Sequence, residues 1–189
     1  MPGRRPPGTG GPSRHPCSYN LRCDTGGVSG DGLDRAEQAA WVRLATILEL
    51  LPGVLDTQLR RDAGLMHFEY LVLAMLSESP KRTLRMSALA AQTNSTPPRL
   101  SHVVTRLEGR GLVERIPSPD DARATNAHLT AAGWRKLRQA APGHVANVRE
   151  NVIDALTAEQ VAQLNAIAEA ILGRIDPDGS MAATYHRYD

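Results

Sequence analysis

The chain has 189 residues and a formal net charge of +2 at pH 7, and aromatic residues make up only 4% of it. This length suits one domain of moderate size with a tail, and a core poor in aromatic residues must be built from Leu, Ile, Val and Ala, which favours helices. No unbroken apolar run reaches the roughly 18 residues that cross a bilayer, and no apolar stretch follows the basic N-terminus as in a signal peptide. We therefore expect a soluble cytoplasmic protein with no membrane partner.

Residues 1–30 are rich in Gly, Pro, Ser and Arg and show no apolar period. Such a segment buries too little apolar surface to fold alone, which predicts a disordered tail. The only role that its basic residues suggest is a non-specific contact with DNA. Cys17 and Cys23 lie in this tail. Without a cluster of His residues they form a weak metal site. Inert thiols are the favoured interpretation, and a disulfide or an oxidant-sensing thiol is the alternative.

Positive charge is concentrated in the middle of the chain. Residues 81–130 contain eight Lys or Arg residues and four acidic residues, a local net charge of +4 against +2 for the whole chain. A nucleic-acid-binding surface requires such a concentration, although a solvated charged face produces the same count.

Apolar periodicity predicts helices before this basic region. Asp34 is placed to cap a helix with apolar residues at helical spacing, namely Trp41, Leu44, Ile47 and Leu51. Pro52 and Gly53 interrupt the pattern, so this helix ends, kinks or continues there. A second, strongly apolar helix is predicted over residues 65–76, in the middle of the fold.

A helix-turn-helix and a hairpin are predicted next. Ser87 is expected to cap a short helix, residues 93–95 form the turn, and Thr96 caps a longer helix with Pro97 at its first position, where a missing N–H costs nothing. Leu100, Val103, Val104 and Leu107 form the buried stripe of this helix, and Gly111 stops it. Residues 112–116 and 124–129 are predicted as the two strands of a hairpin with its tip over residues 117–121.

Two helices are predicted after the hairpin. Thr130 caps the first, which is disturbed at Pro142 and Gly143 and resumes towards Leu156. Thr157 and Gln160 form the capping box of the last, whose apolar stripe consists of Val161, Leu164, Ile167, Ile171 and Ile175. The end of the chain, residues 177–189, is expected to be frayed.

The order helix, turn, helix and hairpin has a physical logic for DNA, because the second helix fits the major groove and the hairpin reaches the backbone or the minor groove. The stretch MSALAAQTNSTPPRLSHVVTRLEGRGLVERIPSPDDARATNAHLTAAG resembles the signature of the MarR family of bacterial regulators. Its matching pieces are S-x-L-A, R-L-S-H-V-V-x-R-L-E, G-L-V-E-R, D-x-R and L-T-x-x-G, in this order. The resemblance implies a mainly α fold with a small β-hairpin wing, a winged helix-turn-helix with a helical dimerisation region from both ends of the chain.

The resemblance also implies a division of the chain and a set of partners. Residues 31–176 become the MarR-like domain, with dimerisation helices at 33–60 and 131–175 around a winged helix-turn-helix at 65–130. A homodimer then binds a pseudo-palindromic site on double-stranded DNA, as a repressor whose binding is relieved by a small aromatic effector, in a stress response. No cofactor is implied. Trp41, His67 and Tyr70 are candidates for the effector pocket, and plain core packing is the favoured alternative for them.

Seven residues are candidate DNA contacts. Arg123 is expected in the minor groove, where negative potential is concentrated, and Arg106 at a phosphate; the others are Thr96, Pro98, Arg99, Ser101 and His102. Two departures from the family pattern stand out. Ala122 replaces the first Arg of the D-R-R wing motif, which weakens local ion-pair support, and Pro97 and Pro98 replace small polar residues, so contact there must be apolar, as with a thymine methyl group.

The sequence does not support an enzymatic function, because it contains no G-x-S-x-G, H-E-x-x-H or P-loop motif. The remaining alternatives are a thiol redox regulator acting through Cys17 or Cys23 and a winged-helix module that binds a protein. Steep weakening by salt distinguishes DNA binding from the protein-binding alternative.

Overall fold

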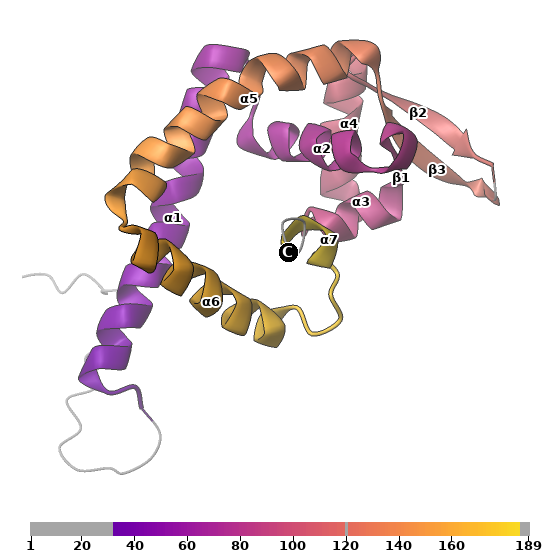
Figure 1. Ribbon diagram of the computed structural model, residues 1–189. Helices are drawn as coiled ribbons and strands as arrows, with labels where there is room; N and C mark the ends of the chain where they lie inside the picture. Colours follow the sequence, from indigo (N-terminus) through magenta and orange to yellow (C-terminus); the bar gives the residue numbers. More distant parts are fainter. Residues whose placement is uncertain (1–31, 120, 186–189) are drawn as a thin grey trace, which may run out of the picture. The chain divides into compact units, whose positions relative to one another are not determined.

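A computed structural model describes residues 32–119 and 121–185 of the chain. Its contacts divide the chain into two units, residues 1–41 and 42–189. The predicted tail, with Cys17 and Cys23, lies outside the described residues. Figure 1 shows the elements, which in chain order are α1 (Arg35–Ala63), α2 (His67–Glu78), η1 (Pro80–Arg82), β1 (Thr83–Arg85), α3 (Met86–Gln92), α4 (Pro97–Gly109), β2 (Val113–Ser118), β3 (Asp121–Leu129), α5 (Ala131–Asn151), η2 (Ile153–Ala155), α6 (Ala158–Ile175) and α7 (Ala182–Tyr185).

Helix α1 begins as predicted at Asp34, whose carboxylate accepts hydrogen bonds from the backbone N–H groups of Ala36 and Glu37 at 2.6 and 2.9 Å. It continues through Pro52 to Ala63. The last turns bury Leu55 and Leu59 in the core, and this packing outweighs the one backbone hydrogen bond that a proline removes. By length and composition alone α1 could cross a membrane, but a single such helix is weak evidence, because a core helix of a soluble protein and a signal sequence pass the same test.

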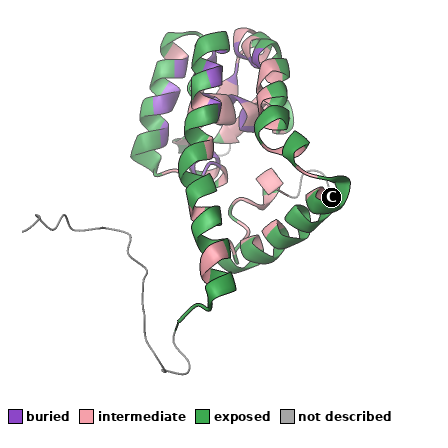
Figure 2. Ribbon diagram, turned by 90° about the vertical axis from the view of Figure 1, so that its left-hand side faces the viewer, coloured by how far each residue is buried: buried purple, intermediate pink, exposed green. Residues whose placement is uncertain are grey.

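The core lies where α2, α3, α4, the sheet and the first turns of α5 meet, as the purple residues of Figure 2 show. Leu73, Leu76, Leu89, Leu100 and Leu107 are each 0% exposed there. Leu, Val, Ala and Met supply all of its buried members. This composition confirms the expectation of an aliphatic, mainly helical core.

The sheet has three antiparallel strands in the order β1-β3-β2. The β2–β3 hairpin is the predicted wing; its strands are longer than expected, and the register shifts between Pro117 and Ser118. Strand β1 was not predicted, because three residues are too few to show an alternating pattern. It pairs Leu84 with Ala127. The predicted cap at Ser87 is wrong, because α3 begins at Met86 and its N-cap residue is Arg85.

The two long helices after the wing begin as predicted. Thr130 Oγ1 accepts a hydrogen bond from the Gly133 N–H at 3.0 Å, and the capping box of Thr157 and Gln160 is complete. Pro142 does not interrupt α5. Helix α6 has no buried residue and is green along most of its length in Figure 2. Residues 177–185, expected to be frayed, instead form a turn and the short helix α7.

Candidate nucleic-acid interface

The helix-turn-helix consists of α3, a three-residue turn and α4. The backbone N–H groups of Thr93, Asn94 and Ser95 close the end of α3 by donating to the carbonyls of Leu89, Ala91 and Ala90. Asn94 has a φ of 44°, a left-handed conformation that Asn tolerates better than most residues. This tight turn directs the chain from α3 into α4.

Helix α4 has the two faces that its sequence predicts. Thr96 is the N-cap residue and Pro97 occupies the first turn. Leu100, Val103, Val104 and Leu107 form the predicted stripe and are buried. The candidate contact residues on the opposite side are all exposed, and they are Thr96, Pro98, Arg99, Ser101, His102 and Arg106.

A buried carboxylate on α2 forms ion pairs with two arginines at the C-terminal end of α4. Glu69 has a side chain only 6% exposed, and Arg106 and Arg110 each bring a guanidinium nitrogen within 3.3 Å of one of its oxygens. Arg110 also donates to the Gly64 carbonyl at 3.0 Å. Arg106, a predicted phosphate contact, therefore has a structural partner, although its side chain is still 50% exposed.

Arg115 joins the wing to the outer face of α4. From β2 it forms an ion pair with Glu108 and donates to the Ser101 carbonyl at 3.0 Å and to the Thr105 hydroxyl at 3.1 Å. Its guanidinium is also 3.3 Å from the Ser101 hydroxyl, so Ser101 is exposed but already has a partner. Sequence reasoning assigned no role to Arg115, because its partners lie up to fourteen residues away on another element.

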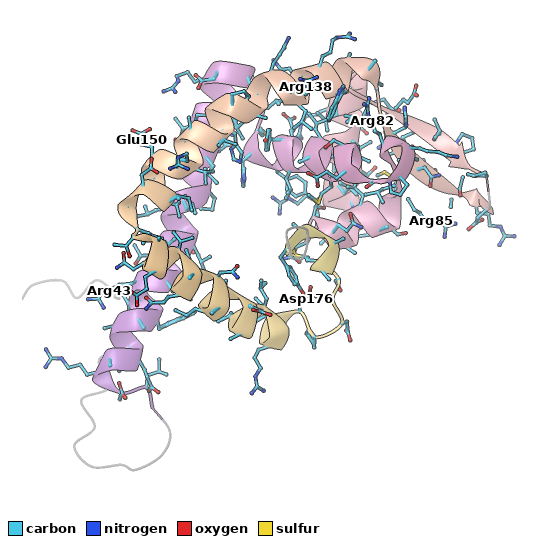
Figure 3. All side chains as sticks on the ribbon, in the orientation of Figure 1. Arg43, Arg82, Arg85, Arg138, Glu150 and Asp176 are labelled. Atoms are coloured by element: carbon cyan, nitrogen blue, oxygen red, sulfur yellow. The ribbon has the colours of Figure 1, made fainter. Side chains whose placement is uncertain are left out.

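The wing presents Arg123 to solvent. Its side chain is exposed, while its backbone N–H donates to the Asp121 carboxylate at 3.0 Å. The other oxygen of Asp121 lies 3.2 Å from the guanidinium of Arg85 on β1, which Figure 3 labels beside the wing. The wing motif of the family has an Arg where this chain has Ala122. In this chain Arg85 supplies an ion pair to the wing.

The first turn of α4 carries a stacked guanidinium. Arg99 lies 4.6 Å from the centre of the Phe68 ring on α2, an arrangement in which the ring attracts the cation while leaving its N–H groups free to point outward. This contact holds the guanidinium end of the side chain against α2 before any partner binds.

Two of the three candidate effector residues come together. His67 and Tyr70 on α2 have ring centres 6.1 and 4.4 Å from that of His144 on α5. Burial lowers the pKa of His67 and of His144, and the proximity of His67 lowers the pKa of His144 further. Trp41 is 49% exposed on α1. No sequence signal pointed to His144, which lies between two predicted halves of a helix.

A helix-turn-helix followed by a β-hairpin defines a winged helix-turn-helix protein. A profile of the MarR family matches residues 64–124. The crystal structure of Sco3205 from Streptomyces coelicolor, a MarR family transcriptional regulator in complex with DNA, is 44% identical with a TM-score of 0.73 over 76% of this chain and 94% of that chain. AbsC from the same organism is 36% identical with a TM-score of 0.73 over 78% and 99%. The chain belongs to the MarR family of transcriptional regulators.

Curated relatives agree with this assignment. The HTH-type transcriptional repressor Rv2887 of Mycobacterium tuberculosis is 34% identical over 57% of this chain and 76% of its own length. The transcriptional repressor MprA of Escherichia coli is 27% identical over 57% of this chain, and the match spans only 60% of MprA. The family confirms the predicted fold and the prediction that the chain is a regulator and not an enzyme.

Proposed function

We propose that the chain acts as a homodimer that binds a pseudo-palindromic operator in double-stranded DNA and represses transcription. Two exposed features carry this proposal: the polar face of α4 and Arg123 on the wing that follows it in the chain. Two relatives support it: the solved structure of Sco3205 holds DNA, and Rv2887 is named a repressor. A regulator of this kind would act in the cytoplasm, at the nucleoid.

The proposed contacts divide into two groups. Arg99 and His102, with Thr96 and Pro98 at the start of α4, face the base edges of the major groove, where Pro98 offers only an apolar contact, as to a thymine methyl group. Arg123 enters the minor groove. Ser101 and Arg106 lie beside them, and their internal partners Arg115 and Glu69 favour contacts to phosphates that fix the register of the protein on the duplex.

The homodimer rests on apolar side chains that the single chain leaves uncovered. On α6, Leu164, Ile167 and Ile171 are 44%, 57% and 39% exposed, and on α1, Ile47 and Leu48 are 54% and 61% exposed. Exposed apolar faces of this extent mark interaction sites. We assign them to dimerisation helices at residues 33–60 and 131–175, with residues 65–130 as the DNA-binding part. Ile167→Asp should convert the dimer into a monomer in sedimentation velocity.

The DNA-binding proposal is tested with the intergenic DNA beside the gene, scanned for an inverted repeat. Fluorescence anisotropy should show specific binding that weakens steeply with salt, because each neutralised phosphate releases a counterion. Arg123→Ala should weaken operator binding by about tenfold or more, on the scale of one good contact in a groove. Arg135→Ala is the matched control, because it removes the same charge from an exposed position on α5. Equal affinities of the two variants would overturn the role of Arg123.

A small-molecule effector is a second candidate function. Gln58 Oε1, His144 Nδ1 and Asn147 Nδ2 are buried without a hydrogen-bond partner in the described part of the chain, and unpaired buried polar atoms call for an occupant. Together with the rings of His67, Tyr70 and His144, these three atoms define the proposed effector site. Trp41 on α1 remains a candidate residue for effector binding. A panel of simple phenols and benzoates should release operator DNA from the wild type, and Tyr70→Ala should need higher concentrations. Release at equal concentrations would reject this pocket.

A further inference from the structure

The last turn of α3 has one backbone carbonyl that the helix-turn-helix does not pair. The final four carbonyls of a helix have no partner within the helix. Those of Leu89, Ala90 and Ala91 accept N–H groups of the turn. The fourth, that of Gln92, accepts the hydroxyl of Thr184 at 3.2 Å. The helix-turn-helix therefore accepts a hydrogen bond from a residue 92 positions further along the chain.

Thr184 reaches this position because the chain folds back after α6. Asp176, labelled in Figure 3, ends α6 and accepts the backbone N–H groups of Ser180 and Met181, both at 2.8 Å, and the hydroxyl of Tyr185 at 3.1 Å. These bonds, with that of Met181 foremost, hold the pKa of Asp176 below its ordinary value. One carboxylate thus closes the loop from Asp176 to Tyr185.

The segment also touches the core under the helix-turn-helix. Thr184 Oγ1 lies 3.4 Å from the sulfur of Met75 on α2, a residue that is 4% exposed. Helices α3 and α7 are in contact, and Figure 1 shows them side by side.

We propose that residues 176–185, which we call the C-terminal hook, position the helix-turn-helix by completing the end of α3, and that Thr184 is the residue through which they act. Because the hook begins at Asp176, the residue that directly follows α6, it connects a proposed dimerisation helix to the turn that directs the chain into α4. Loss of the hook leaves the fold and the dimer intact but allows the turn and the start of α4 to move. This inference rests on the proposed operator binding.

The test compares four full-length variants in operator binding and amide hydrogen exchange. Thr184→Val keeps the shape of the side chain and removes the donor, and Thr184→Ser restores the donor. Tyr185→Phe removes one bond inside the hook. Thr57→Val is the matched control, because the Thr57 hydroxyl bonds a helical carbonyl on α1, that of Gly53. A chain that ends at Asp176 removes the rest of the hook.

We expect Thr184→Val to weaken operator binding by about fivefold, the effect of one lost hydrogen bond, and the shortened chain by more. Non-specific DNA binding and its salt dependence should not change. The amides of Thr93, Asn94 and Ser95 should exchange faster in both, whereas Thr184→Ser and Thr57→Val should match the wild type.

Unchanged exchange and operator affinity in the shortened chain would overturn the proposal, and so would tighter binding, which would indicate autoinhibition. Failure of the wild type to bind any operator would reject the proposed function instead. The hydrogen-exchange measurement needs no DNA, so it separates these two failures.

Discussion

A guanidinium nitrogen of Arg110, the residue that caps the C-terminus of α4, lies 3.3 Å from the carboxylate of Glu69 on α2, whose side chain is almost fully buried. The same carboxylate accepts the Met66 backbone N–H at 3.0 Å and pairs with Arg106. One buried anion therefore joins the start of α2 to the last turn of α4 and to the residue that follows it. A buried charge is favourable only while its hydrogen bonds are complete.

Replacing this anion should reduce stability more than DNA binding. Glu69→Gln keeps the size of the side chain but deprives both arginines of their charged partner, so we expect the free energy of unfolding to fall by about 1 to 3 kcal/mol. Urea denaturation measures it. Glu169→Gln on the exposed α6 is the control and should stay within about 0.5 kcal/mol of the wild type. A loss no larger than that of the control would show that the pair is not a fixed link.

Gly133 should be intolerant of any side chain. A Cβ atom there would lie 2.0 Å from the Leu112 carbonyl oxygen and 2.6 Å from Leu129 Cδ1. The first is backbone that also receives the Thr130 backbone N–H, so it cannot move aside without disturbing the junction of wing and α5. We expect Gly133→Ala to lower the melting temperature and to destabilise the fold by about 1 to 3 kcal/mol or more.

Gly173 provides the opposite case. It lies within α6, and a Cβ atom added to it would have no neighbour within 4 Å among the described residues. Gly173→Ala should therefore stabilise the chain by up to about 1 kcal/mol, because alanine favours helix. If both glycine variants melted alike, close packing at Gly133 would not be the reason for the glycine.

Local signals were enough to predict most of the helices and the wing. Asp34, Thr130 and Thr157 cap helices as expected because capping involves residues only three positions apart. The buried stripe of α4 was predicted for the same reason, since its period lies within one helix. At Pro52 the sequence left continuation of the helix open, and at Pro142 it predicted a disturbance that α5 does not show. The sequence does not show how much packing surrounds a helix.

The site was less predictable than the fold. Its candidate contacts follow from the exposed side of one helix, but their internal partners come from other elements. In the sequence, Glu69 is a single charged residue in an apolar helix, and Arg115 is one of several basic residues in a positively charged region. Each acts through a residue that tertiary structure brings near, and no local spacing predicts such a pair.

The link from Arg115 to α4 should set the position of the wing. Arg115→Ala removes the bonds to Ser101 and Thr105 and the ion pair with Glu108, so we expect operator binding to weaken by about tenfold with less effect on non-specific binding. Arg115→Lys separates two roles. A lysine retains the charge but cannot form this forked set of bonds, so it should resemble the alanine variant; recovery of affinity by lysine would indicate a phosphate contact instead.

Acidification should destabilise the junction of α1, α2 and α5. Burial lowers the pKa of both His67 and His144, so each binds its proton less readily when folded than when unfolded. Their contribution to stability is present above the unfolded pKa of about 6.5 and is lost as the pH falls below it. Asp56, which pairs with Arg60 and accepts the backbone N–H of His67, opposes this effect in part, because its negative charge raises the pKa of His67. Asp62 on α1 pairs with Arg61 and adds further negative charge nearby.

The measurement is the free energy of unfolding at about pH 7.5 and about pH 5.5, a window in which ordinary carboxylates stay ionised. Each histidine contributes a slope of at most about 1.4 kcal/mol per pH unit, and less here because both rings are partly exposed. His144→Gln removes one of the two proton sites, so its stability should change less with pH than that of the wild type. His102→Gln on the exposed face of α4 leaves the pair intact and should keep the wild-type slope. Equal slopes in all three proteins would place the acid sensitivity elsewhere in the chain.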